Sequence, residues 1–249
     1  FGKSKMKIAI AQINTTVGDI AGNTSKIISI IEKAKSSTID LVIFPELSIT
    51  GYPPRDLLTN DQFIKNNLVA LQEIRQHCQN IATICGYVNW NKTKHGKRLY
   101  NSAAFIDNKK IVHSINKTLL PSYDVFDEDR YFEPSENNEI IKFKGFRIAL
   151  TICEDIWNYS KDLKFTYTRD PIAELQKFKP DLLLNISAST FHRNKIDTRM
   201  QLFKTILKKY KFKWSLYCNL VGGNDDLVFD GQSFVLDSKG LCVALAKSF

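Results

Sequence analysis

The chain has 249 residues, of which 43% are hydrophobic and 11% aromatic, and its formal net charge is +9. A chain of this length can bury one large core, and this composition excludes an intrinsically disordered protein. No apolar run approaches the roughly 18 residues of a transmembrane helix, and the start lacks the apolar segment of a signal peptide, so we expect no membrane partner.

The first half of the chain predicts strand and helix alternation followed by a hairpin. The expected elements are a strand over 6–13, a helix capped by Asn23, a strand over 40–44, a helix over 61–79, a strand over 81–87 and hairpin strands over 99–106 and 111–115. We interpret Met6 as the native initiator and residues 1–5 as an added leader.

The second half predicts the same alternation. The expected elements are a strand over 146–152, a helix with Pro171 at its first position, a strand over 182–186, a long amphipathic helix around 196–210, a strand over 214–221 and hairpin strands around 226–236 and 241–246. Alternating strands and helices with added hairpins indicate an α/β fold with mixed sheets and helices packed outside. No linker or repeat divides the chain, so we expect a single domain over residues 1–249.

The long helix carries a basic cluster, defined here as Lys204, Lys208, Lys209, Lys211 and Lys213. Such a cluster can bind nucleic acid, but no RNA- or DNA-binding motif accompanies it. We favour a solvated helix face, or a docking face for an acidic partner or a neighbouring domain. The sequence therefore predicts no nucleic-acid partner.

The five cysteines are odd in number and form no CxxC pair, and the four histidines form neither HxH nor HExxH. Unpaired cysteines are typical of the reducing cytosol, whereas a disulfide framework needs paired ones. We therefore expect a cytoplasmic protein with no metal site.

The strand over 146–152 stops at a thiol followed by two carboxylates, Cys153-Glu154-Asp155. Open α/β sheets place their chemistry beyond the carboxyl ends of strands, where side chains face a crevice. A cysteine at this place is a nucleophile if a base lies nearby, and otherwise a buried structural residue.

Two more residues of catalytic type, Glu46 and Lys117, also follow directly after predicted strands. Taken singly, Glu46 could be a first-turn acid and Lys117 a solvated loop residue. Together with Cys153 they form a workable acyl-transfer set, in which the carboxylate moves protons and the ammonium stabilises an oxyanion.

Three segments resemble the signatures of the nitrilase superfamily of carbon–nitrogen hydrolases, in the family's order. They are Leu-Val-Ile-Phe-Pro-Glu46-Leu-Ser-Ile-Thr-Gly-Tyr, Asn-Lys117-Thr-Leu-Leu-Pro and Ile-Cys153-Glu-Asp-Ile-Trp. Segments 12–23, 51–58 and 219–234 are similar to the glutaminase domains of glutamine-dependent NAD⁺ synthetases. The resemblance therefore extends over nearly the whole chain.

The resemblance implies a four-layer α-β-β-α sandwich that assembles into homo-oligomers. It implies that Cys153 attacks the side-chain amide of L-glutamine, forms a thioester and releases ammonia for the amidation of deamido-NAD⁺. Glu46 would be the general base, Lys117 would hold the oxyanion, and Glu128 would position the lysine and the substrate. Glu128 could otherwise be an ordinary loop acid.

The same resemblance implies a set of substrate-binding residues, namely Tyr52, Tyr123, Glu154, Ser189 and Lys195. Lys195 could equally be a first-turn surface lysine, and Tyr52 a packing residue. Two segments depart from the family. Thr190 replaces the usual proline after Ser189, so we expect a less rigid substrate loop, and segment 158–169 is longer and more basic than expected.

A synthetase domain is expected to be absent from this chain, since no GxxxxGK[ST] or Ser-Gly-Gly-x-Asp motif occurs. We therefore expect no cofactor here, with ATP and Mg²⁺ needed only by an attached synthetase domain or a partner subunit. Two alternatives are a stand-alone amidase acting on another small amide, and a non-catalytic module that uses the basic cluster.

Overall fold

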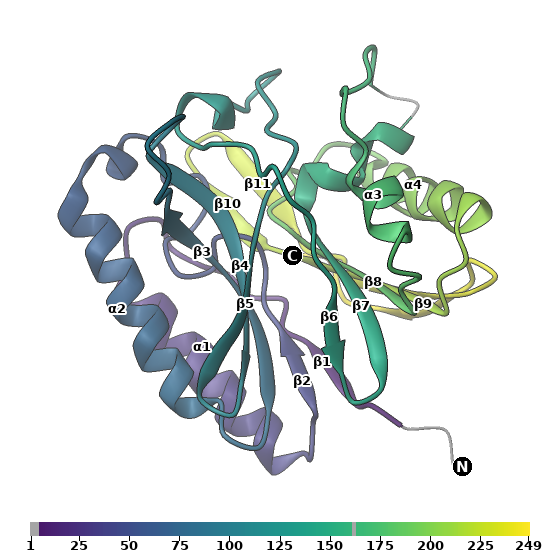
Figure 1. Ribbon diagram of the computed structural model, residues 1–249, viewed down its shortest axis with the longest axis horizontal. Coiled ribbons are helices and arrows are strands. Elements are labelled where there is room, and N and C mark those ends of the chain that lie inside the picture. Colours follow the sequence, from purple (N-terminus) through teal and green to yellow (C-terminus); the bar gives the residue numbers. More distant parts are fainter. Residues whose placement is uncertain (1–4, 161–162) are drawn as a thin grey trace.

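The computed structural model describes residues 5–160 and 163–249; residues 1–4 of the expected leader and residues 161–162 of the long segment lie outside it. Two sheets pack face to face, and helices cover their outer faces (Figure 1). The chain therefore forms the expected α-β-β-α sandwich with mixed sheets, and the fold prediction is confirmed.

The first sheet has the order β1-β2-β3-β4-β5. Its strands are β1 (Ile8–Ile10), β2 (Leu41–Ile43), β3 (Ala82–Trp90), β4 (Leu99–Asp107) and β5 (Lys110–Asn116). The first three strands are parallel, because α1 (Ile20–Ser36) and α2 (Asp61–His77) provide the crossovers. The predicted hairpin is confirmed as β4 and β5, whereas β1 is shorter than the expected 6–13 strand.

The predicted cap of the first helix is wrong. The helix begins at Ile20, before Asn23, and the Asp19 side chain accepts the N–H of Gly22 as its N-cap. Asn23 lies inside α1 and is fully buried. Its side chain bonds the backbone of Thr16 and Ile49, so it fastens the preceding loop instead of capping the helix.

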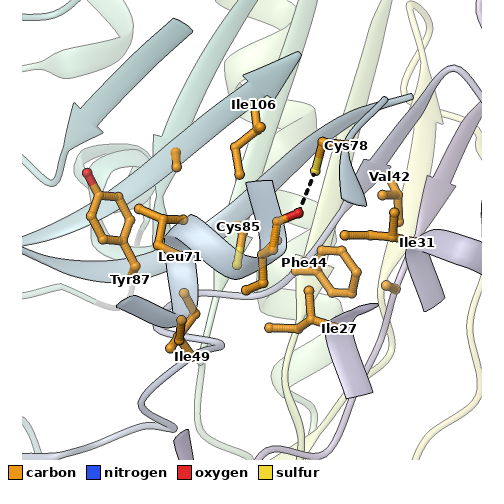
Figure 2. Close-up of a cluster of buried hydrophobic side chains, with 14 of the residues drawn as sticks. Ile27, Ile31, Val42, Phe44, Ile49, Leu71, Cys78, Cys85, Tyr87 and Ile106 are labelled. Carbon is orange, nitrogen blue, oxygen red and sulfur yellow. Dashed lines mark hydrogen bonds between the residues drawn. The ribbon is translucent and has the colours of Figure 1, made fainter. Parts of the chain in front are cut away.

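Figure 2 shows the core between α1, α2 and the first sheet. Ile27 and Ile31 of α1 and Leu71 of α2 are buried together with Val42 and Phe44. The apolar positions of each helix recur at the spacing of one helical face, so both helices lie flat against the sheet. This packing fixes β2, and with it the residues that follow β2.

The second sheet has the order β13-β12-β9-β8-β7-β6. Its strands are β6 (Ile141–Phe143), β7 (Phe146–Ile152), β8 (Leu182–Ser187), β9 (Trp214–Asn219), β12 (Phe234–Asp237) and β13 (Cys242–Leu245). Strands β7, β8 and β9 are parallel and are linked through α3 (Pro171–Gln176) and α4 (Lys195–Lys209). Asp170 caps α3 and Pro171 opens it, as predicted.

Shorter elements complete the chain. They are the hairpin β10 (Val221–Asn224) and β11 (Leu227–Asp230), and the 3₁₀-helices η1 (Arg55–Thr59), η2 (Glu128–Arg130) and η3 (Cys153–Tyr159). A cluster of apolar side chains from both sheets fills the space between them. In the described part of the chain, no helix has the length and apolar character needed to cross a membrane.

Candidate active site

Glu46 and Lys117, which follow different strands of the first sheet, meet in the fold. Glu46 comes shortly after β2 and Lys117 directly after β5, and Lys117 Nζ lies 2.8 Å from Glu46 Oε1. Both side chains are fully buried. The charges of both residues act on the thiol of Cys153, which comes directly after β7 of the second sheet. The structure therefore brings together all three residues of the expected acyl-transfer set.

The Lys117 ammonium lies between two carboxylates. Besides Glu46, it donates to Glu128 Oε1 at 2.7 Å and Oε2 at 2.8 Å. Burial disfavours the charged ammonium, but the charges of Glu128 and Glu46 outweigh it and hold the pKa of Lys117 well above its usual value. Lys117 therefore remains a cation at neutral pH.

Glu128, on η2, is buried beside this ammonium and also accepts the Tyr52 hydroxyl at 2.8 Å. Burial raises the pKa of Glu128 to about 7; Lys117 opposes this rise and Glu46 adds to it. Glu46 and Glu128 share the single ammonium of Lys117, so ionisation of Glu128 beside an ionised Glu46 costs free energy. Tyr52 also lies beside these residues, through its contact with Glu128.

Sequence reasoning missed Asn101, on β4. Its side-chain amide donates to Glu46 Oε1 at 2.7 Å and to Glu128 Oε2 at 3.3 Å, and its backbone carbonyl oxygen accepts the backbone N–H of Lys117 at 2.8 Å. The residue is 1% exposed. A polar residue inside a buried strand was the available signal, because such a group needs partners that an apolar core does not supply.

Cys153 is the first residue of η3 and comes directly after β7, at a constrained turn. Its φ of 42° lies in the left-handed region that non-glycine residues rarely adopt, and its side chain is 6% exposed. Burial raises the pKa of the Cys153 thiol well above its usual value; Glu46 adds to this rise and Lys117 opposes it. The resting thiol is therefore protonated, and its reaction requires a base.

Asp155, which sequence reasoning left without a role, ties this turn to the lysine segment. Its Oδ1 accepts the N–H groups of Thr118 at 2.9 Å and Leu119 at 2.8 Å, and its Oδ2 accepts that of Ile152 at 2.9 Å. Burial raises the pKa of Asp155 to about 6, although these three bonds oppose the rise. One side chain therefore sets the position of Cys153 relative to Lys117.

Glu154 contacts Tyr123, which is one of the predicted substrate-binding residues. Its Oε1 accepts the hydroxyls of Tyr123 and Tyr167, each at 2.9 Å. Tyr167 belongs to the long segment, and Phe165 packs edge-on against both tyrosines. Glu154 is buried, and burial raises its pKa, whereas Lys117, the two hydroxyls and Lys195 lower it. Nothing in the sequence pointed to Tyr167.

Ser189 and Lys195 lie on the second sheet's side of the site. Ser189 follows β8 and is 4% exposed. Its backbone N–H donates to Asn219 Oδ1 at 2.9 Å. Lys195 is the first residue of α4, and its Nζ lies 4.2 Å from the centroid of the Trp157 ring. Glu154 and Lys195 thus bring opposite charges to the same region, next to Cys153.

A cavity of about 360 Å³ adjoins the site and is lined by Tyr52 and Glu128 among others. Cys153, Ser189 and Lys195 do not line it. The cavity therefore reaches the buried Glu128 carboxylate, but neither Glu46 nor the thiol. Among the residues that the structure describes, no group of three or more His, Cys, Asp or Glu side chains could hold a metal ion.

Comparison with known proteins gives the family of the chain. Residues 7–249 match the family model described as carbon–nitrogen hydrolase. The glutamine-dependent NAD(+) synthetase of Synechocystis is 39% identical over 248 residues, which is 97% of this chain and 44% of that protein. The enzyme of the same name from Thermotoga maritima is 36% identical over 249 residues, covering 98% of this chain and 40% of that protein. The chain thus spans less than half the length of these relatives.

Two solved structures have a similar fold. The glutamine-dependent NAD⁺ synthetase of Acinetobacter baumannii, in complex with ADP, superposes with a TM-score of 0.85 at 34% identity, covering 98% of this chain and 44% of that chain. An amidase of the nitrilase superfamily from Nesterenkonia, solved as a cysteine-to-alanine mutant, superposes with a TM-score of 0.83 at 19% identity, covering 99% of this chain and 88% of that chain. The second similarity concerns the fold alone.

Proposed function

Since this chain belongs to the carbon–nitrogen hydrolase family, we propose that it is a glutaminase, which hydrolyses the side-chain amide of L-glutamine through a thioester on Cys153. One observation carries the proposal: the buried Lys117 ammonium, held by Glu46 and Glu128, lies in the electrostatic surroundings of the Cys153 thiol. A base, a cation and a nucleophile are thus available in one site.

In the first step Glu46 takes the thiol proton while the sulfur attacks the amide carbon. A C–S bond forms, and the carbonyl electron pair moves to the oxygen. Lys117 stabilises this oxyanion, because its position is fixed by three hydrogen bonds before the charge develops. The raised pKa of the thiol makes the base necessary, since little thiolate exists at rest.

In the second step the oxyanion reforms the carbonyl and the C–N bond breaks. Glu46 returns its proton to the leaving nitrogen, so ammonia departs and a thioester remains. A water molecule then attacks the thioester after giving a proton to Glu46. The C–S bond breaks, glutamate leaves, and the sulfur regains a proton from Glu46.

The substrate side supports an amino acid as the ligand. Glu154 offers a carboxylate for the α-ammonium group, and Lys195 offers an ammonium for the α-carboxylate. The hydroxyls of Tyr123 and Ser189 supply further polar contacts. We assign these four residues to glutamine because charges of both signs lie next to Cys153, an arrangement that suits a zwitterion.

The ammonia would serve the amidation of deamido-NAD⁺ by a synthetase domain or subunit. This part of the proposal rests on relatives named glutamine-dependent NAD(+) synthetase, whose length is more than twice that matched here. ATP and Mg²⁺ would act in that synthetase part. The resemblance also supports a homo-oligomer, which light scattering or analytical ultracentrifugation would test.

The first experiment is labelling with a diazoketone analogue of glutamine, read by intact and peptide mass. We expect labelling of Cys153 only, and protection by excess glutamine. The exposed Cys242 is an internal control for nonspecific reaction, and Cys153→Ala is the negative control. Unprotected labelling of several cysteines, or no labelling while iodoacetamide still reaches Cys153, would refute glutamine and lead to a panel of other small amides.

A further inference from the structure

Arg199 on α4 is a charged side chain that the proposed chemistry does not use. It is 1% exposed and is among the largest of the fully buried side chains in the described part of the chain. Arginine is almost never buried to this extent unless it is paired. Its surroundings therefore contain groups that hold it.

On one side Arg199 forms an ion pair with Asp230 at the end of β11. Nη1 lies 2.8 Å from Asp230 Oδ1 and 2.9 Å from Oδ2, and the Asp230 side chain is also 1% exposed. A buried ion pair contributes little net stability, because the loss of hydration offsets the attraction. Stability alone is therefore a weak reason for this pair.

On the other side Arg199 holds the backbone that follows β8. Nη2 donates to the carbonyl oxygens of Ser189 at 2.9 Å and Thr190 at 3.2 Å, and Nε donates to Ser189 Oγ at 3.2 Å. A guanidinium group can only donate, so Ser189 Oγ acts as an acceptor in this contact. The hydroxyl hydrogen of Ser189 can then be donated to the neighbouring Tyr217 hydroxyl or to a substrate carboxylate.

The same backbone also contacts the proposed base. The N–H of Ala188, one residue before Ser189, donates to Glu46 Oε2 at 2.8 Å. Hydrogen bonds thus link Asp230 to Arg199 and Arg199 to the 189–190 backbone. The adjacent N–H of Ala188 continues this connection to Glu46. Displacement of this backbone would move a substrate contact and a partner of the base together.

We propose that Arg199, held by Asp230, is a positioning residue, which fixes Ser189 toward the substrate and the Ala188 N–H toward Glu46. The inference rests on the proposed function, since it assigns Ser189 to the substrate. The planar fork of arginine is required, because a lysine ammonium cannot reach the carboxylate and two carbonyl oxygens in this fixed geometry. The contact with the Thr190 carbonyl oxygen also holds the loop that was expected to be less rigid.

The test is Arg199→Lys, which keeps the buried charge. We expect the KM for glutamine to rise about tenfold or more while kcat falls less than about threefold, because charge-assisted hydrogen bonds to the substrate loop are lost. Arg147→Lys is the control. Arg147 pairs with Asp181 at the far end of β7 from Cys153, so we expect an unchanged KM. A wild-type KM in Arg199→Lys, or a lower melting temperature with no change in KM, would overturn the inference.

A second variant decides the question if Arg199→Lys does not fold. The double change Arg199→Met with Asp230→Asn removes both charges at once, so no uncompensated charge stays buried. We expect the same rise in KM, and a wild-type KM would contradict the role.

A further readout does not need glutamine. The rate of Cys153 alkylation by iodoacetamide should fall by about threefold in Arg199→Lys, because Glu46 loses a fixed partner. Absence of glutamine turnover in the wild-type protein would refute the proposed function alone. An unchanged alkylation rate in the variant would then refute the role of Arg199.

Discussion

The two sides of the site differ in how they are built. Glu46 and Lys117 are fully buried, and their side-chain partners come from β4, from residues that follow strands and from η2. Tyr123 and Tyr167 lie on connecting segments, are only partly buried, and meet Glu154 through single hydroxyl contacts. Residues fixed by packed strands give the precision that proton transfer needs, whereas loops allow recognition to vary.

Removal of the buried cation tests the first half of this comparison. We expect Lys117→Met to abolish turnover and to destabilise the fold by about 3–5 kcal/mol, because two buried carboxylates lose their counter-charge. Urea unfolding and ammonia release measure the two effects. Lys97→Met is the matched control, since Lys97 pairs with Asp129 at the surface and such pairs contribute about 1 kcal/mol or less. Equal destabilisation by Lys117→Met and Lys97→Met would contradict the conclusion that Lys117 is a buried counter-charge and Lys97 a surface one.

The pH dependence of stability probes the same network. The folded pKa of Glu128, about 7, lies above its ordinary value of 4.5, so the folded protein binds more protons than the unfolded chain between these values. Its contribution to stability is fully present below pH 4.5 and is lost as the pH rises through 7. We expect the unfolding free energy of the wild type to fall between about pH 4.5 and 7 more steeply than that of Glu128→Gln. Parallel curves would show that Glu128 is not the group responsible.

The recognition side should respond more mildly. Tyr167→Phe removes one of two hydroxyls from Glu154 but keeps the aromatic packing against Phe165. We expect the KM for glutamine to change by about two- to fivefold with kcat unchanged, since one hydrogen bond at a partly exposed site contributes about 1 kcal/mol. Steady-state kinetics measure the change. A large loss of kcat would place Tyr167 in the chemistry and would weaken the contrast between the two sides.

The basic cluster at the end of α4 should matter least. Lys204 and Lys208 are exposed, so we expect Lys204→Gln with Lys208→Gln to leave kcat, KM and the melting temperature unchanged within error. A mobility-shift assay with nucleic acid at low salt checks the alternative function. Salt-dependent binding by the wild type that is lost in the variant would support a nucleic-acid partner after all.

Local sequence patterns were enough to place candidate residues at strand ends. The run before Glu46 is a short buried strand that stops at Pro45, and the run before Cys153 is a buried strand that ends at the thiol, so both positions could be identified from strand ends. The opening of α3 by Asp170 and Pro171 was equally local. In each case the deciding interactions lie within a few residues of one another.

Only the tertiary structure assigned the supporting residues. Asn101 reaches Glu46 from a position 55 residues away, and Arg199 reaches Asp230 from one 31 residues away, so no local pattern reports these contacts. The cap at Asp19 is local, since its side chain accepts the N–H of Gly22 three residues later. Only the fold excludes Asn23 as the cap, because it engages the Asn23 side chain with Ile49. The sequence by itself determined which strand ends carry reactive groups. The packing of the two sheets decided which buried polar groups hold them in place, because burial obliges each polar group to find a partner wherever the fold supplies one.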